Sequence, residues 1–211
     1  MYVQYGCGFS APQEWVNFDA SPTLKWERMP ILGRLYTKNP RRFPWNVEYG
    51  DIVRGLPVRA GSCKGVFASH VLEHLALNDF NRALENTKRM LQKGGIFRLI
   101  VPDLEWVARQ YLQRVEAGDP TANVFFLRAT DLGREVRQRG LTAFIHEWLR
   151  TSRHMWMWDQ ESLVQTLREH GFTSIRTCSF GDCEDRMFAL VEERSRFENA
   201  VAVEARGDSR T

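Results

Sequence analysis

The sequence predicts an α/β fold built around an open, mostly parallel β-sheet. Strand-like and helix-like segments alternate from the N-terminus to about Asp103, which is the pattern of a sheet with right-handed crossover connections. The first strand-like run ends in Gly6-Cys7-Gly8 and the second ends in Asp19, so a glycine loop and a carboxylate are expected at neighbouring strand ends. A composition of 43% hydrophobic and 26% charged residues is that of an ordinary globular protein.

Five strands are expected in the first half of the chain, because five short β-rich runs are each bounded by turn residues. They cover Tyr2–Tyr5, Trp15–Phe18, Asn46–Tyr49, Gly65–Ser69 and Ile96–Val101. Only about six residues separate Gly8 from the second run, whereas a crossover that contains a helix needs about a dozen or more. The first crossover helix is therefore expected to be reduced or missing.

The helices are predicted from the spacing of apolar residues. A helix is expected over Asn78–Gln92, with Asn78 as its N-cap and Gly94-Gly95 as its stop signal. The region Leu104–Trp158 is expected to be mainly helical. Its clearest helical segments are Glu105–Ala117 and Leu141–Arg150.

The last part of the chain predicts one more helix and two strands. The helix covers Asp159–His170, with Asp159 as the N-cap and Gly171 as the stop. The strands Ser174–Phe180 and Asn199–Ala205 are expected to pair antiparallel. All of 1–211 is expected to form one domain, with a proline- and aromatic-rich insert at 20–45.

Charge, cysteine content and the length of the apolar runs indicate where the protein is located and which partners it can have. A net charge of +3 permits an anionic partner but does not demand one. The four cysteines form no C-x-x-C pair, which is typical of reduced thiols in a cytosolic protein. No apolar run reaches the roughly 18–20 residues of a membrane span, and the N-terminus lacks a signal peptide pattern. We therefore expect a cytoplasmic protein without a membrane span.

Five short motifs occur in order along the first half of the chain. They are Tyr5-Gly6-Cys7-Gly8, Trp15-Val16-Asn17-Phe18-Asp19, Tyr49-Gly50-Asp51-Ile52, Ser69-His70-Val71-Leu72-Glu73-His74-Leu75 and Leu91-Gln92-Lys93-Gly94-Gly95-Ile96. Through them the sequence resembles the class I S-adenosylmethionine-dependent methyltransferases, and among these the compact type 11 branch. The resemblance implies a Rossmann-like sheet that is mostly parallel, with an antiparallel last strand. It also implies that the insert at 20–45 and the helical region 104–158 form the acceptor side.

The resemblance implies S-adenosylmethionine as the cofactor and gives roles to the glycine loop. Gly6, Cys7 and Gly8 would let the backbone approach the methionine part of the cofactor. Asp19 would accept hydrogen bonds from the ribose hydroxyls.

The same resemblance gives roles to two later motifs. Asp51 would accept a hydrogen bond from the adenine amino group, while the backbone N–H of Ile52 binds a ring nitrogen. Ser69 and His70, at the end of the fourth strand, would lie beside the sulfonium and the methyl group.

The sequence departs from the family pattern at two places. Gln4 stands where the family commonly has an acid, although an amide can still accept and donate hydrogen bonds. The missing first helix disfavours NAD, because a pyrophosphate requires a helix N-terminus and a third glycine. S-adenosylmethionine has no phosphate, so a simple glycine loop suffices.

The string His70-Val71-Leu72-Glu73-His74 also matches the inverted zinc-peptidase motif. The context argues against a peptidase, because the motif follows a strand and no third ligand can be singled out. A weak Mg²⁺ site is a second option, since some quinone-biosynthesis O-methyltransferases carry acids and a histidine in this loop. Mg²⁺ prefers oxygen ligands, however, and His70 stands where those enzymes have a carboxylate. We expect no metal, with Glu73 and His74 holding the loop and the following helix.

Methyl transfer is an in-line displacement that depends mainly on positioning. His70 and His154 are the candidate catalytic residues, because an imidazole can take a proton from a hydroxyl acceptor near neutral pH.

The predicted function is methyl transfer from S-adenosylmethionine to a small molecule or to a cell-envelope sugar or lipid, with O-methylation ahead of N- or C-methylation. A homodimer is left open. The alternative is a non-catalytic protein of the same fold that binds the cofactor or acts as a scaffold. A nucleic-acid methyltransferase is the lesser alternative, because no Asn/Asp-Pro-Pro-Tyr motif follows the fourth strand and no binding domain is appended.

Overall fold

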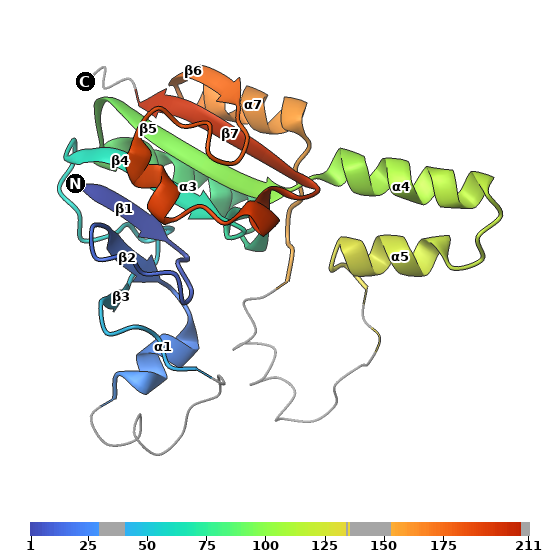
Figure 1. Cartoon of the computed structure of the whole chain (residues 1–211), viewed down its shortest axis with the longest axis horizontal. Coiled ribbons are helices and arrows are strands. Elements are labelled where there is room, and N and C mark those ends of the chain that lie inside the picture. The colour runs from blue at the N-terminus through green and yellow to red at the C-terminus, as the bar shows by residue number, and fades with distance from the viewer. Residues whose placement is uncertain (30–40, 134, 136–152, 208–211) are drawn as a thin grey trace.

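The computed structural model describes residues 1–29, 41–133, 135 and 153–207, which form a seven-stranded sheet with helices (Figure 1). The strand order is β3-β2-β1-β4-β5-β7-β6. The neighbours from β3 to β5 are parallel, and β7 runs antiparallel to both β5 and β6. This confirms the predicted α/β fold, including the antiparallel last strand.

The strands lie within a few residues of their predicted positions. They are β1 (Tyr2–Tyr5), β2 (Val16–Asp19), β3 (Val47–Tyr49), β4 (Cys63–Ser69), β5 (Leu91–Pro102), β6 (Phe172–Thr177) and β7 (Ala200–Gly207). The central strands are buried on both faces, as expected for parallel strands with helical layers. Their carboxyl ends meet at one edge of the sheet, which brings the motif residues together.

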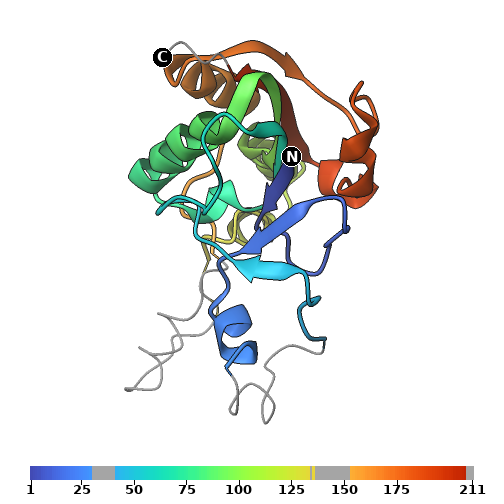
Figure 2. The ribbon, with the colours of Figure 1, turned by 90° about the vertical axis from the view of Figure 1, so that its left-hand side faces the viewer.

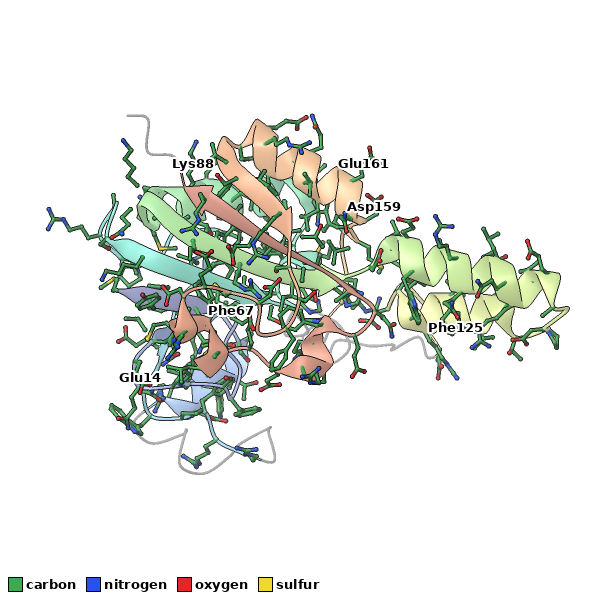
Figure 3. The ribbon with its side chains drawn as sticks, turned by 45° about the horizontal axis from the view of Figure 1, so that its top comes forward. Glu14, Phe67, Lys88, Phe125, Asp159 and Glu161 are labelled. Carbon is green, nitrogen blue, oxygen red and sulfur yellow. The ribbon has the colours of Figure 1, made fainter. Side chains whose placement is uncertain are left out.

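Helices occur in the three predicted helical regions, and one further helix, α1, lies in the insert where no helix was predicted. They are α1 (Pro22–Glu27), α3 (Leu77–Met90), α4 (Leu104–Glu116), α5 (Ala122–Ala129) and α7 (Gln160–Glu169), with 3₁₀ turns η1 (Leu72–His74), η2 (Arg186–Leu190) and η3 (Arg194–Phe197). Asp159 caps α7 by accepting the Ser162 N–H, and Figure 3 shows Asp159 at that end of the helix. The predicted segment Leu141–Arg150 lies outside the described residues.

The predicted ends of α3 are wrong. The N-cap residue is Ala76, which has no side chain that could cap the helix. Asn78, the predicted N-cap, lies within the first turn instead. The helix ends at Met90 and β5 begins at Leu91, so Gly94-Gly95 are no helix stop. Gly94 has a φ of +71° and lies where the register of β4 against β5 shifts, so this glycine pair accommodates a bulge.

No helix lies between β1 and β2, which confirms the reduced first crossover. The chain from the end of β6 to β7 covers this part of the sheet instead. Phe188 of η2 packs edge-on against Trp15 and Phe67, and the Trp15 indole N–H donates to the Met187 carbonyl at 3.1 Å. Figure 2 shows these 3₁₀ turns on the side of the sheet opposite α3 and α7, and Figure 3 labels Phe67 beneath them.

A buried ion cluster lies under the same connection. Arg98 of β5 is fully buried, and its guanidinium contacts Glu192 at 2.5 Å, Glu204 at 2.8 Å and Asp182 at 2.9 Å. Burial disfavours ionised Asp182, but hydrogen bonds from Arg176, Ser179 and Arg98 outweigh it and lower its pKa to about 2. The cluster fixes the 3₁₀ connection to the sheet.

Helices α4 and α5 form a hairpin that projects from the sheet (Figure 1). Its base is held where the Leu104 N–H donates to the Trp158 carbonyl at 2.9 Å. No described helix is long and apolar enough to cross a membrane.

Candidate functional site

A cavity of about 1050 Å³ opens at the carboxyl ends of β1, β2 and β3. Its lining includes Gly6, Asp19, Asp51, His70 and His74. The sheet topology therefore brings together residues that the sequence placed at separate strand ends.

Asp19 anchors the glycine loop from the end of β2. Its Oδ2 accepts the Gly8 N–H at 2.9 Å, and its Oδ1 accepts the Ser21 N–H at 2.7 Å. The residue is 8% exposed and lines the larger cavity. Each carboxylate oxygen keeps a second lone pair, so Asp19 can still accept hydrogen bonds from a ligand.

The glycine loop requires its two glycines for different reasons. Gly6 has a φ of +65°, and a Cβ there would lie 2.1 Å from the Val71 side chain. Gly8 has a φ of +55°, and a Cβ there would meet nothing within 4 Å, so only its backbone conformation favours glycine. Between them, burial and then the charge of Asp19 raise the pKa of the Cys7 thiol to about 12, so Cys7 is a neutral thiol.

Gln4 holds the loop that replaces the missing helix. Its buried amide Nε2 donates to the Ser10 carbonyl at 2.8 Å and to Asn17 Oδ1 at 2.6 Å. Asn17 in turn donates to the carbonyls of Pro12 and Trp15 at 3.0 and 2.9 Å. An ionised acid at position 4 could donate to neither acceptor, which explains the departure from the family pattern.

Gln4→Glu is therefore expected to destabilise the fold by about 2–3 kcal/mol, because a buried carboxylate would face two acceptor oxygens. Chemical denaturation at neutral pH measures this change. Gln165→Glu is the matched control, since Gln165 is an exposed amide on α7, and it should change the unfolding free energy by less than about 0.5 kcal/mol. Equal stability of Gln4→Glu and the unchanged protein would contradict this role of the amide.

Asp51 and Ile52 lie in the turn after β3. Asp51 Oδ1 accepts the Val53 N–H at 2.9 Å, and the Ile52 carbonyl accepts from Asn86 Nδ2 at 2.8 Å. These bonds fix the turn, so the Asp51 carboxylate lines the larger cavity in a defined position.

A second cavity of about 570 Å³ lies on the other side of the glycine loop. It shares Gly6 and His70 with the larger cavity and is also lined by Ser69, Glu193 and Arg196. The Ser69 hydroxyl is buried and has no hydrogen-bond partner among the described residues. A donor that lines a cavity without a partner is available to a ligand.

His70 lies where the two cavities meet. It has a φ of +53°, an uncommon conformation for a residue with a side chain, and its Nε2 lies 2.9 Å from the Arg196 carbonyl. Burial lowers the pKa of His70 below its ordinary value, so the imidazole is neutral near pH 7.

Glu73 and two histidines form a cluster behind His70. Glu73 is fully buried, and neither carboxylate oxygen has a hydrogen-bond partner among the described residues. Burial raises its pKa to about 8. The rings of His74 and His154 lie 5.2 Å apart, and His154 does not line either of the two cavities described above.

The sequence motifs did not indicate Glu193 and Arg196. Arg196 lies in η3 and Glu193 is its N-cap residue; this segment is far along the chain from the glycine loop and carries no motif of its own. Only the long-range packing of the β6–β7 connection places them at the smaller cavity.

The chain matches a protein family described as "Methyltransferase domain" over residues 9–177. The sequence has no match among curated proteins. Solved structures share its fold, among them an S-adenosylmethionine-dependent methyltransferase from Archaeoglobus fulgidus. That likeness has 14% identity, covers 97% of this chain and 85% of the other, and has a TM-score of 0.50.

Two further structures are similar. One is an S-adenosylmethionine-dependent methyltransferase from Methanosarcina mazei, with 13% identity, coverage of 98% and 92%, and a TM-score of 0.50. The other is the DszA carbon methyltransferase, with 14% identity and a TM-score of 0.51; the match covers 98% of this chain but 47% of that chain. The family match spans most of the chain and agrees with the sheet order. The chain therefore belongs to the methyltransferase domain family and is an S-adenosylmethionine-dependent methyltransferase.

Proposed function

We propose that this methyltransferase binds S-adenosylmethionine across the two cavities and methylates a hydroxyl oxygen of a small molecule. The observation that supports this is the meeting of the cavities at Gly6 and His70. A ligand with an adenosine end and an amino acid end can lie on both sides of the glycine loop. S-adenosylmethionine supplies a methyl group that its sulfonium makes electrophilic.

The adenosine end is assigned to the larger cavity. Asp19 accepts hydrogen bonds from the ribose hydroxyls while its other lone pairs hold the loop. Asp51 accepts from the adenine amino group, and the Ile52 N–H donates to a ring nitrogen.

The amino acid end is assigned to the smaller cavity. Gly6, Cys7 and Gly8 provide the backbone on which it lies, and the partnerless hydroxyl of Ser69 is free to donate to it. This end is a zwitterion, and the charged residues that line the cavity are Arg41, Glu193 and Arg196. Arg196 Nε and Glu193 Oε2 lie 3.9 Å apart, and both side chains are about half exposed. The pair can open to bind the carboxylate and the ammonium group separately.

The acceptor is proposed to approach at His70. A neutral imidazole there can take the proton that a hydroxyl loses as its oxygen is methylated. Both cavities have the size of small-molecule sites, which fits a cofactor that spans them. The proposed acceptor is a small molecule, including a hydroxyl of a cell-envelope sugar or lipid intermediate.

Two ligands test the amino acid end. S-adenosylhomocysteine has both ends, whereas 5′-methylthioadenosine lacks the amino acid. Arg196→Ala is expected to weaken S-adenosylhomocysteine binding about tenfold in calorimetric titration and to leave 5′-methylthioadenosine unchanged. Arg194→Ala is the matched control, because Arg194 lies over the Phe180 ring and not at the cavity. Equal loss for both ligands, or no loss, would overturn the assignment.

The acceptor is tested by S-adenosylhomocysteine release from a library of small hydroxyl compounds. Turnover that falls at least 100-fold in His70→Ala supports the proposed base. Cofactor binding without turnover on any hydroxyl acceptor would contradict O-methylation and favour a non-catalytic binding protein.

A further inference from the structure

Glu73, His74 and His154 bring their side chains to one point beside the larger cavity. Each offers one carboxylate oxygen or ring nitrogen, and these atoms all lie within 4.8 Å of one another. Glu73 and His74 come from the 3₁₀ turn after β4, while His154 comes from the segment before α7. The cluster therefore joins two parts of the chain that are distant in sequence.

Both histidines are oriented by backbone carbonyls. Nδ1 of His74 lies 2.9 Å from the Arg153 carbonyl, and Nδ1 of His154 lies 3.1 Å from the Thr130 carbonyl. A carbonyl only accepts, so each contact places the imidazole proton on Nδ1. The Nε2 atoms then carry the lone pairs, and Nε2 of His74 lies 3.8 Å from Glu73 Oε1. Metal-binding histidines are commonly fixed in this way, with the second nitrogen donating to a carbonyl.

The carboxylate of Glu73 accepts no hydrogen bond from any described residue. Its backbone already joins the two segments, because the Glu73 carbonyl accepts the N–H groups of Met155 and Trp156 at 2.7 and 3.1 Å. Its carboxylate adds no hydrogen bond to this contact and is fully buried. Removing a carboxylate from water without a partner is costly, so this side chain requires a cation or a proton.

We infer that Glu73, His74 and His154 form a binding site for a divalent transition-metal ion, with Zn²⁺ as the best match. Two imidazoles and one carboxylate are a common ligand set for zinc with an open fourth position. Mg²⁺ prefers oxygen ligands and fits this set poorly. The site does not depend on where the cofactor binds.

The three ligand atoms need to move only modestly closer together to bind an ion. Ligands at 2.0–2.1 Å from a tetrahedral ion lie about 3.4 Å apart, compared with the present limit of 4.8 Å. His70 is not one of the residues whose ligand atoms all lie within 4.8 Å of one another; its Nε2 faces the Arg196 carbonyl, and its Nδ1 lies 3.6 Å from Glu73 Oε1. The ion would tie the turn after β4 to Arg153–Trp158, which lies next to a wall of the larger cavity.

The test is metal binding by the full chain after dialysis against a chelator. Calorimetric titration with Zn²⁺ should show one site per chain, with a rise in melting temperature. Co²⁺ should give the visible absorption of a tetrahedral nitrogen and oxygen site. His74→Ala and His154→Ala should each weaken Zn²⁺ binding by at least tenfold. His170→Ala is the matched control, because His170 is the C-cap residue of α7 and its ring contacts the Thr166 carbonyl, so its loss should leave binding unchanged.

Glu73→Gln separates a metal ligand from a residue that only supports the fold. It keeps the shape of the side chain, so the metal-free variant should fold and melt at or above the temperature of the unchanged protein. The Zn²⁺-induced rise in melting temperature should be lost. The inference is overturned if the unchanged protein binds no Zn²⁺ at about 100 μM, if both histidine variants bind it normally, or if Mg²⁺ competes equally.

Discussion

Asp19→Ala is expected to weaken binding of S-adenosylhomocysteine by about 100-fold. The substitution removes the proposed acceptor of the ribose hydroxyls, and hydrogen bonds to a charged group contribute about 1.5–3 kcal/mol. It also releases the N–H groups of Gly8 and Ser21, which are 2.9 and 2.7 Å from the carboxylate. Calorimetric titration of both proteins measures the loss.

Asp119→Ala is the matched control for that experiment. Asp119 accepts the N–H of Thr121 at 2.8 Å, the same local turn that Asp19 makes with Ser21, but it lies between α4 and α5 and lines neither cavity. Its loss should leave the affinity within about twofold. Binding by Asp19→Ala within a factor of three of the unchanged protein would contradict the assigned role.

Arg98→Met is expected to lower the free energy of unfolding by about 3–5 kcal/mol, because it leaves buried carboxylates without their cation. Glu192 and Glu204 both contact Arg98 and are almost fully buried. Chemical denaturation at pH 7 measures the effect. Adding Glu192→Gln to Arg98→Met should recover part of the loss, since one unpaired charge is then removed.

Arg176→Met provides the comparison for Arg98→Met. Arg176 contacts the same Asp182 and Glu204 but is 40% exposed, so its loss should cost about 1 kcal/mol or less. The loss of unfolding free energy caused by Arg98→Met should also become smaller as the pH falls. The pKa of Asp182 is lowered to about 2 in the folded protein, so its stabilisation is present above about pH 4 and is lost as the pH falls toward 2. A constant difference between pH 7 and pH 3 would contradict this electrostatic account.

The sequence predicted the parts of the site that depend on local pattern. A strand, a glycine loop and a following acid are adjacent in the chain, so Gly6, Gly8 and Asp19 could be placed at one sheet edge before the fold was known. Asp51 and Ser69 were assigned through the family resemblance instead, and they lie at or just after the ends of strands that run parallel to β1 or β2.

The sequence could not predict contacts between distant segments. Arg196 reaches the glycine loop only because η3 packs over the face left by the missing helix, and His154 meets Glu73 only through the fold. Gln4 looked like a weakened cofactor residue, whereas its hydrogen bonds to Ser10 and Asn17 show that it holds the loop. The end of α3 was misjudged because a glycine pair can mark a strand bulge as well as a helix stop.

Hydrogen exchange with and without saturating S-adenosylhomocysteine tests the proposed cofactor site most directly. We expect slower exchange at three places on one sheet edge: the glycine loop with residues 19–21, the turn at 51–53, and residues 69–71. We expect no change in α5, which lies in the projecting hairpin and contains Phe125 (Figure 3). Protection confined to other segments, or no binding at millimolar ligand, would contradict the site.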